Sequence, residues 1–464
     1  MAADSASSHV SPRMRDLILS ISPRIDAALA TKSACIDLAT AENWLLRSEL
    51  RNIIFGDADL LAAFADFFGT YFRPRVDVTP SQLVVAPGAT HCLDALLTTI
   101  CDEGDSVLVP VPHWNGFALH FQLRPRVKVV PVVPKWTAGQ LDGTSRPLID
   151  SLVPALRRAM DGVADRTRIK ALVMTNPNNP LGQCYPEGVL QEALDFCRDA
   201  GLHYISDELY ALSQLGTGAG FVSALSLDAR RRPSDIEGAV DVVSGSGPNP
   251  DSDTATTTSW DAQNINMNAK RKLDAPLSPA TRKSKRAKRN DQGRPDALVH
   301  VIWSTSKDVC SSGVRIAALV SQSREAGLIL KSVGLLSSMH VSSLSSLATT
   351  YLLRSPAFPG LVTTISRRLA CAHDVAHARF RRWAVPFFPA DAGPFVVVRL
   401  GPRAAGADVM ARLRSAQVTV AEAHSFGGGW CDADDGFWVR LTVAVPPAVL
   451  WDGLNQIGFA LGYS

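Results

Sequence analysis

The chain has 464 residues, of which 46% are hydrophobic and 20% are charged, with 47 Lys and Arg against 44 Asp and Glu. This composition excludes a chain disordered throughout, a collagen-like repeat and a coiled coil, because apolar content is high and neither a glycine period nor sustained heptads occur. The length suits one large domain or two to three smaller ones. The formal net charge of +3 by itself says nothing about partners.

The sequence shows no sign of export or membrane insertion. Residues 1–15 are polar and lack the apolar core of a secretory signal, and no run of about 18 or more apolar residues occurs. The 8 cysteines are scattered without CxxC spacing, which is typical of reduced thiols rather than of a disulfide framework or a zinc site. We therefore predict a soluble, cytoplasmic protein with no membrane partner.

Short β-branched runs alternate with helical stretches between residues 83 and 209. This alternation predicts βαβ units, and so an α/β fold with a mainly parallel sheet covered by helices on both faces. The expected strands cover residues 83–86, 106–111, 127–133, 169–175, 202–207 and, after a long interval, 297–303.

The long interval before the last strand has a different composition. Residues 223–295 are rich in Ser, Asp, Asn, Thr, Pro and Gly, and they include the basic stretch 270–289 with a local charge of +8. Such a segment cannot bury enough apolar area to offset its ordering entropy, so we predict a disordered surface insertion. A nuclear-import signal and a nucleic-acid patch are alternatives for the basic stretch. Because it lacks interleaved aromatic residues and a folded module, we favour a solvated loop without nucleic-acid binding.

The C-terminal part mixes strands with helices, which predicts a smaller α/β domain. Expected strands cover residues 394–400, 417–423 and 436–444, and expected helices cover 366–383, 406–416 and 447–461. The predicted organisation is an N-terminal arm (1–47), a large domain in two parts (48–222 and 297–345) separated by the insertion (223–296), and a small C-terminal domain (346–464).

The most specific chemical motif is STSKDVCSSGVR, residues 304–315, directly after an apolar strand. A lysine flanked by small hydroxyl residues, with an arginine eight positions on, suits a phosphorylated aldehyde cofactor. The amine of Lys307 would form a Schiff base with the aldehyde, while hydroxyl groups and the Arg315 guanidinium would hold the phosphate. By itself the motif could equally be a surface lysine in a Ser-rich turn.

Two further polar clusters follow strand ends. TNPNNPLG (175–182) predicts a turn with free side-chain amides. HYISDELY (203–210) ends a strand with Asp207 and places Tyr210 three residues later. A buried carboxylate at the carboxyl end of a strand is costly unless it pairs with a cation, and a protonated pyridine nitrogen is such a cation. Each cluster alone could be a simple turn or helix cap, but all three in this order favour a cofactor site.

With these motifs, the sequence resembles the fold-type I pyridoxal-phosphate enzymes. Within them it is similar to the class I/II aminotransferase family, and specifically to its 1-aminocyclopropane-1-carboxylate synthase-like subgroup. Four further segments carry the resemblance: IDLATAENWL (36–45), PGATHCLDAL (87–96), PVPHWNGF (110–117) and FWVRLTV (437–443). The resemblance implies a large domain on a mainly parallel seven-stranded-type sheet flanked by helices, a smaller α/β C-terminal domain, a homodimer, and pyridoxal 5'-phosphate as cofactor.

The resemblance also implies roles for the residues around the cofactor ring. Lys307 would carry the cofactor and then act as the base at the substrate α-carbon. Asp207 would pair with the pyridine nitrogen, and Asn179 and Tyr210 would hydrogen-bond the 3′-oxygen of the ring. Trp114 would stack on the ring face, which its large π surface suits.

A second group of residues would hold the charged ends of cofactor and substrate. The phosphate pocket would combine backbone N–H groups at a helix start with hydroxyl groups and a guanidinium. Its implied members are Gly88, Ala89, Thr90, Ser304, Ser306 and Arg315. Arg440 would clamp the substrate α-carboxylate in a bidentate pair, with Asn179 beside it. Glu42 matches a position at the active-site entrance of the subgroup.

Two features lie outside the resemblance: a phenylalanine at a position where the family usually has a tyrosine, and a pair of histidines that could bind a metal ion. Phe55 stands where the family usually has a tyrosine that reaches the phosphate of the neighbouring subunit, which argues against a strict 1-aminocyclopropane-1-carboxylate synthase. His373 and His377 lie four apart on an expected helix. No glutamate stands in HExxH register and no third ligand is evident, so we predict no metal site.

We predict a pyridoxal-phosphate-dependent aminotransferase acting at the α-carbon of an amino acid or an amino-acid-derived substrate. Fungal relatives of the subgroup include enzymes of secondary metabolism, which makes such a role a hypothesis for this chain. The alternative is a carbon–sulfur lyase or a synthase-like elimination enzyme, because the same residues serve both reactions. A non-catalytic relative with a binding role is a third hypothesis, against which the complete set of cofactor and substrate residues argues.

Overall fold

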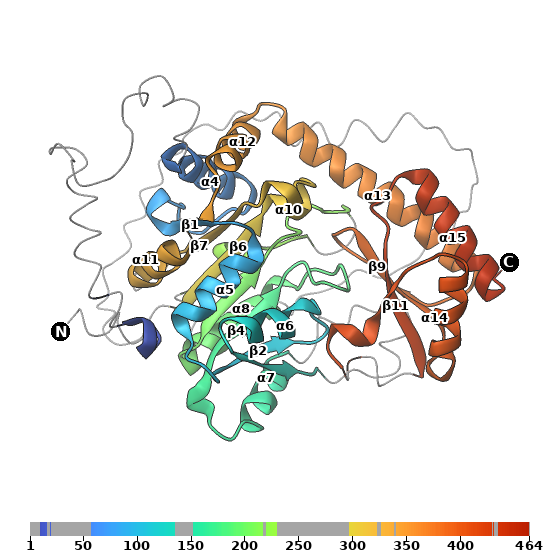
Figure 1. Cartoon of the computed structure of the whole chain (residues 1–464), viewed down its shortest axis with the longest axis horizontal. Helices are drawn as coiled ribbons and strands as arrows, with labels where there is room; N and C mark the ends of the chain where they lie inside the picture. Colours follow the sequence, from blue (N-terminus) through green and yellow to red (C-terminus); the bar gives the residue numbers. More distant parts are fainter. Residues whose placement is uncertain are drawn as a thin grey trace, which may run out of the picture. The chain divides into compact units, whose positions relative to one another are not determined.

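The chain forms two β-sheets with helices packed around them (Figure 1). In this computed structural model, the described residues are 10–15, 19, 57–134, 152–216, 220–229, 297–322, 326–337, 340–428, 430 and 435–463. The first sheet has the strand order β1-β7-β6-β5-β4-β2-β3, and the second has the order β10-β11-β9-β8.

The strands of the first sheet occupy the runs that the sequence predicts, with one addition. They are β1 (Leu83–Ala86), β2 (Ser106–Pro110), β3 (Lys128–Val132), β4 (Ile169–Thr175), β5 (His203–Asp207), β6 (Leu298–Ser304) and β7 (Ala317–Ser321). The strands β3, β2, β4, β5 and β6 are parallel, whereas β7 runs antiparallel to both β6 and β1. The predicted mainly parallel sheet is therefore confirmed, and β7 is the strand that the sequence pattern missed.

Helices cover both faces of this sheet. They are α4 (Asp57–Tyr71), α5 (Ala89–Ile100), α6 (Gly116–Leu123), α7 (Leu152–Asp161), α8 (Glu187–Ala200), α10 (Thr305–Asp308), α11 (Ala326–Ser337) and α12 (Ser343–Arg354). Alternate residues of a strand point to opposite faces. In β4, Ala171 and Val173 pack into a core with α5, α6 and α11, while Leu172 and Met174 pack into a core with α4, α7 and α8. Burial on both faces explains why these strands are continuous apolar runs.

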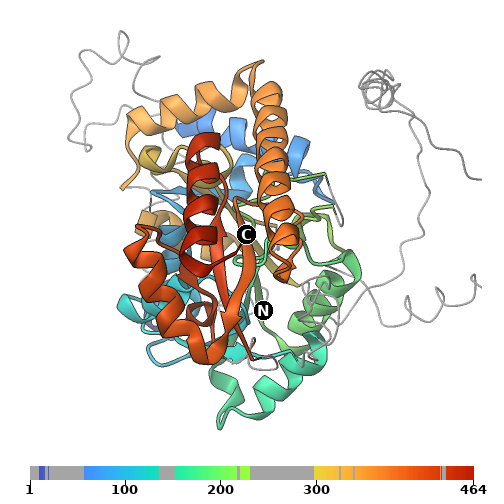
Figure 2. The ribbon, with the colours of Figure 1, turned by 90° about the vertical axis from the view of Figure 1, so that its right-hand side faces the viewer.

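The second sheet, at the C-terminal end, is antiparallel. Its strands are β8 (Phe387–Phe388), β9 (Phe395–Pro402), β10 (Ala421–Glu422) and β11 (Gly436–Thr442), and its helices are α13 (Phe358–Arg382), α14 (Gly406–Ser415) and α15 (Pro447–Leu461). Figure 2 looks onto these helices. The strand expected at 417–423 is much shorter, because the N–H of Val418 is taken up by Leu413 at the end of α14 (2.9 Å).

Short 3₁₀ helices join several of these elements. They are η1 (Pro80–Gln82), η3 (Arg166–Arg168), η4 (Ala224–Ser226), η6 (Ser312–Val314), η8 (Arg403–Ala405) and η9 (Ala423–Phe426). Helix α12 spans the boundary predicted at residue 346 and packs along α4. The first residues of the predicted C-terminal domain therefore lie with the large sheet.

The start of the predicted insertion needs correction. Residues 223–229 are ordered, since η4 lies among them and both Leu225 and Leu227 are 4% exposed. These leucines continue the apolar pattern of the preceding residues. The predicted insertion is defined by the polar composition of residues 223–295 as a whole, in which two leucines have little weight. At the other end, the N–H of Ala297 lies 3.4 Å from the carbonyl oxygen of Ala229. The predicted disorder of residues 230–296 lies outside the described residues, as do Glu42 and Phe55.

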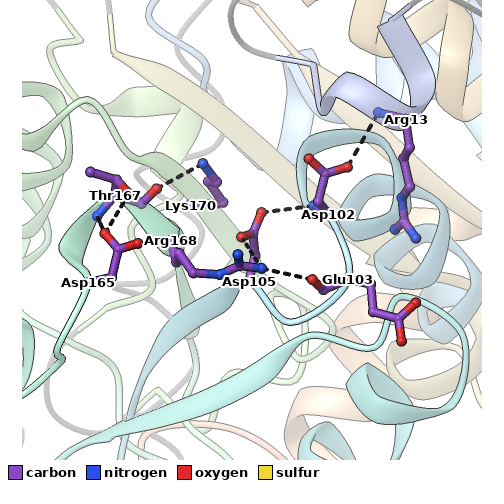
Figure 3. Close-up of polar contacts among 8 residues, drawn as sticks. All are labelled: Arg13, Asp102, Glu103, Asp105, Asp165, Thr167, Arg168 and Lys170. Carbon is purple, nitrogen blue, oxygen red and sulfur yellow. Dashed lines mark hydrogen bonds and ion pairs between the residues drawn. The ribbon is translucent and has the colours of Figure 1, made fainter.

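A charged network lies where β2 and β4 begin, at the edge of the sheet opposite to the motif residues (Figure 3). Arg168 donates to the backbone oxygen of Glu103 (2.8 Å) and lies 3.2 Å from the Asp105 carboxylate. Asp105 in turn accepts the N–H of Asp102 (2.8 Å), and the carboxylate of Asp102 lies 3.3 Å from the N–H of Arg13. The network thus joins the N-terminal residues to the strands at this edge.

Candidate active site

A cavity of about 400 Å³ lies at the carboxyl ends of β4, β5 and β6. This edge of an open α/β sheet is where ligands usually bind. The cavity lining includes Ala89, Thr90, Trp114, Asn179, Asp207, Tyr210, Ser304, Ser306, Lys307, Arg315 and Arg440. Residues that the sequence places far apart therefore converge on one space, and Gly88 lies next to the lining as the cap of α5.

Lys307 lies on α10, the single turn that follows β6. The turn begins at Ser304, whose hydroxyl accepts the N–H of Ser306 (3.1 Å) and donates to the carbonyl of Ile316 (2.8 Å). Such capping satisfies a backbone donor that a helix start leaves free. The Lys307 side chain is exposed and lines the cavity, whereas the next residue, Asp308, is buried.

Asp207 ends β5 and is 6% exposed. Burial raises the pKa of its carboxyl to about 7, while the N–H of Leu209 and the charge of Lys307 act in the opposite direction. Among the described residues, its side chain accepts one hydrogen bond, a long one of 3.4 Å from Leu209. A buried carboxyl with so few donors is well matched to a cationic ligand.

Arg440 brings the second sheet to the cavity. Its Nη1 donates to Asn179 Oδ1 over 2.7 Å, and its guanidinium carbon lies 4.5 Å from the Phe426 ring and 5.2 Å from the Phe395 ring. Burial lowers the pKa of the guanidinium, and its Nε has no hydrogen-bond partner within the described part of the chain. A buried, unused N–H on a guanidinium that lines a cavity suits a carboxylate ligand.

The three asparagines of the 175–182 turn have different roles. Asn176 donates to the carbonyl of Val222 (2.8 Å), and Asn178 donates to the carbonyl of Pro112 (2.9 Å). Both amides therefore hold neighbouring segments in place. Asn179 is the one of the three that lines the cavity, as the sequence predicts.

Two aromatic residues complete the walls of the cavity. Tyr210 is 9% exposed and contacts Phe395 edge to face, with ring centroids 5.2 Å apart. Burial raises the pKa of its hydroxyl, so the group stays protonated. Trp114 stacks on His120 at 5.3 Å and lies directly over Gly116, where an added Cβ would overlap the indole.

The start of α5 faces Arg315. Gly88 caps this helix with φ +104°, a conformation that favours glycine, and a Cβ there would overlap the Arg315 guanidinium. Arg315 is held by the carbonyls of Pro87 (3.1 Å) and Ser312 (2.7 Å). The first N–H groups of a helix, with its dipole, attract anions. Together with the Ser304 and Ser306 hydroxyls, this arrangement suits a phosphate group.

Sequence reasoning missed three residues of this region. Phe395 and Phe426 flank Arg440, and Asp308 follows Lys307 on α10 and is buried. Phe395 begins a strand and is indistinguishable in sequence from a core residue. Asp308 carried a usable signal, because an acidic residue follows the lysine directly in the motif.

The predicted absence of a metal site concerned His373 and His377. His373 Nε2 lies 3.0 Å from the carbonyl oxygen of Gly393, and His377 stacks on Phe387 at 4.6 Å. Burial lowers the pKa of both, that of His377 to about 4. No group of three or more His, Cys, Asp or Glu side chains among the described residues is arranged to hold a metal ion.

None of the helices in the described ranges is long and apolar enough to cross a membrane.

Known proteins resemble this chain along its whole length. Residues 30–246 match the model of the family described as aminotransferase class I and II. The chain is 31% identical to the probable aminotransferase aclI of Aspergillus oryzae over 99% of each chain. The chain belongs to the class I and II aminotransferase family.

Other aminotransferases and relatives agree with this family. The probable aminotransferase gliI of Aspergillus fumigatus is 29% identical over 94% of this chain and 91% of its own. The 1-aminocyclopropane-1-carboxylate synthase 1 of Oryza sativa subsp. indica is 36% identical, over 39% of this chain and 36% of its own. An aspartate aminotransferase of Thermus thermophilus, solved with maleate, matches with a TM-score of 0.62 at 18% identity, covering 89% of this chain and 85% of that one. The predicted family, aminotransferase class of enzyme and fold are confirmed.

Proposed function

We propose that this aminotransferase-family chain uses pyridoxal 5'-phosphate to transfer the α-amino group of an amino acid or an amino-acid-derived substrate. The observation that carries the proposal is the convergence of Lys307, Asp207 and Arg440 on one cavity. These three groups are an amine, a buried carboxyl and a buried guanidinium. They match the aldehyde and ring nitrogen of the cofactor and the carboxylate of an amino acid.

The residues present fit the cofactor. The backbone N–H groups at the start of α5 and the Arg315 guanidinium would hold the phosphate, together with the hydroxyls of Ser304 and Ser306. Asp207, with its single weak donor, would hold the protonated ring nitrogen. Asn179 and Tyr210 would donate to the 3′-oxygen, and Trp114 would cover the ring. When bound, pyridoxal phosphate supplies an electron sink that makes the α-hydrogen of the substrate acidic.

The chain's own groups would then bind and orient the substrate and move its proton. Arg440 would pair with the α-carboxylate, and its bond to Asn179 holds the guanidinium in one orientation. The neutral amine of Lys307 would remove the proton from the α-carbon and return it at another atom. The Tyr210 hydroxyl, kept protonated by burial, can donate a hydrogen bond without losing its proton.

The relatives support transamination over elimination. Both full-length relatives named above are called probable aminotransferases, whereas the synthase matches about two-fifths of this chain. Purified protein with cofactor should convert amino acids to keto acids only when a keto-acid acceptor is present. Release of pyruvate or thiol from cysteine conjugates without an acceptor would instead favour the lyase. We also propose a role in fungal secondary metabolism, on the resemblance to the subgroup described above.

Reduction with borohydride tests the attachment of the cofactor. The holoenzyme should carry a reduced pyridoxyl group on the peptide that contains Lys307, and Lys307→Ala should carry none. Lys170→Ala, at the opposite edge of the sheet (Figure 3), is the matched control and should be labelled like the wild type. A wild type that stays unlabelled would contradict the cofactor assignment.

The oligomeric state and location stay predictions. We propose a homodimer, on the resemblance to the family, and a cytoplasmic location, on the sequence. Light scattering of the holoenzyme at micromolar concentration tests the first, and fractionation of the native host cell tests the second.

A further inference from the structure

Asp308 follows the cavity lysine and points away from the cavity. It is 1% exposed, and its carboxylate accepts three hydrogen bonds. Oδ2 accepts the N–H of Leu212 (3.0 Å) and Nε1–H of Trp303 (2.8 Å), and Oδ1 accepts the hydroxyl of Ser213 (2.6 Å). Buried carboxylates are retained where several donors converge on them.

The donors come from two elements that border the cavity. Leu212 and Ser213 lie in the turn that carries Tyr210, and the N–H of Ser213 donates to the Tyr210 carbonyl (3.1 Å). Trp303 is the last residue but one of β6, is fully buried, and packs against Phe67 with ring centroids 4.3 Å apart. Asp308 therefore connects the lysine turn to the tyrosine turn and to the aromatic core.

The lysine turn has little stability of its own. Helix α10 is only 4 residues long, and a single helical turn without tertiary contacts is not stable in water. Its N-terminal end is capped by Ser304. At its C-terminal end, the carboxylate of Asp308 provides the side-chain connection to the rest of the large domain.

We propose that Asp308 is a positioning residue, which holds Lys307 and Tyr210 at a fixed separation across the cavity. This inference rests on the proposed function, because Lys307 must carry the cofactor for its position to matter. Asp308 itself faces away from the cavity and acts through the lysine turn. Displacement of a catalytic group by about 1 Å can slow a reaction about a hundredfold.

The variant Asp308→Asn tests the proposal at nearly constant volume. With its oxygen at the Oδ2 position the amide can still accept from Leu212 and Trp303, but its NH₂ group then faces the Ser213 hydroxyl, so that hydrogen bond must reverse its direction. Ser213→Ala and Trp303→Phe each remove one donor and keep the carboxylate, so they remain informative if Asp308→Asn fails to fold.

Glu208→Gln is the matched control. Glu208 is equally buried, and its carboxylate accepts hydrogen bonds from Ser206 (2.8 Å), Ser223 (2.6 Å) and the N–H of Ala224 (2.8 Å). Two of these donors lie in the segment at 223–224 and Ser206 lies on β5, so none of them belongs to the lysine turn. Loss of stability from a buried acid should therefore be similar in the two variants, whereas an effect on Lys307 should be confined to Asp308→Asn.

Two measurements follow Lys307 itself. The first is the pH midpoint of the absorbance of the holoenzyme, which reports on the lysine–cofactor linkage. The second is the exchange of the substrate α-hydrogen for deuterium. We expect Asp308→Asn to move the midpoint by at least about half a pH unit and to slow exchange about tenfold to hundredfold. Ser213→Ala and Trp303→Phe should each show a smaller change in the same direction.

A double-mutant comparison separates an effect on the position of Lys307 from a loss of activity that does not depend on Lys307. In a Lys307→Ala protein supplied with ethylamine as external base, adding Asp308→Asn should change the exchange rate less than about twofold, because no lysine remains to be positioned. An equal loss in both backgrounds, or an equal midpoint shift in Glu208→Gln, would overturn the proposal. Failure of the proposed function gives a different result, since borohydride would then label no Lys307 in the wild type.

Discussion

Removal of the insertion is expected to leave the enzyme intact. The N–H of Ala297 already lies 3.4 Å from the carbonyl of Ala229. If residues 231–295 are deleted, Ala229 and Ala297 become the first and fourth residues of a four-residue turn, in which this contact is the closing hydrogen bond. Substituting Asn and Gly at the two central positions, Arg230 and Asp296, provides the residues that such turns prefer.

The expected change in the free energy of unfolding follows from the entropy of loop closure. For a disordered loop, the cost of closure grows as about 1.5 RT times the logarithm of its length. Shortening a loop of roughly 65 residues to two should raise the free energy of unfolding by on the order of 2–3 kcal/mol. A smaller deletion, of residues 241–290, should yield about 1 kcal/mol by the same relation.

The deletion should not change cofactor binding or catalysis in the cavity. The insertion leaves and re-enters at the start of β6, whereas Lys307 follows the end of that strand. Seven residues of strand span about 20 Å. The affinity for pyridoxal phosphate and the rate of amino transfer should therefore stay within about twofold of the wild type.

Urea unfolding and cofactor titration of three proteins check this reasoning. The proteins are the full chain with both turn substitutions, the short deletion and the long deletion. Stability should increase in that order. A stability that falls with deletion length would refute the predicted disorder of the segment, and a loss of cofactor affinity in a folded deletion protein would refute its separation from the cavity.

Three further predictions concern single residues of the cavity. Burial raises the folded-state pKa of Asp207 above its ordinary value, to about 7, so the carboxyl lowers the stability of the cofactor-free protein as pH rises from about 4 to 7. Asp207→Asn should flatten this decline by up to about 1.4 kcal/mol per pH unit in urea titrations; parallel curves would contradict the assignment. Gly116→Ala should displace Trp114, because the new Cβ would overlap the indole, and should weaken cofactor binding about tenfold, as measured by fluorescence; unchanged affinity would mean that the indole does not cover the ring. Arg440→Lys should raise KM for amino acids about tenfold to hundredfold, since a lysine cannot pair bidentately; a KM within threefold of the wild type would show that the carboxylate binds elsewhere.

Local patterns were sufficient to predict most of the strands of the large sheet and most of the residues that line the cavity. Strands buried on both faces must be apolar throughout, so the run that ends at Asp207 and the run that ends before Ser304 stand out in the sequence. Because parallel strands end at the same edge, polar residues directly after such runs come together. The convergence of Lys307 with Asp207 could therefore be inferred without a structure.

Contacts between distant parts of the chain could not be inferred this way. The direction of β7 depends on which strand it pairs with, and its four apolar residues are equally compatible with a parallel strand. The bond between Arg440 and Asn179 joins residues 261 positions apart. Asp308 and Ser213 are 95 positions apart. No local period or spacing encodes such partners.

By itself, the sequence determined most of the strands of the large sheet, which motif residues meet at the carboxyl edge of that sheet, and which family the chain resembles. The tertiary structure alone decided that Asn176 and Asn178 hold neighbouring segments, that Phe395 and Phe426 flank Arg440, and that Asp308 anchors the lysine turn. The physical reason is that periodicity and capping are properties of neighbouring residues, whereas burial and hydrogen-bond partners depend on which surfaces the fold brings together.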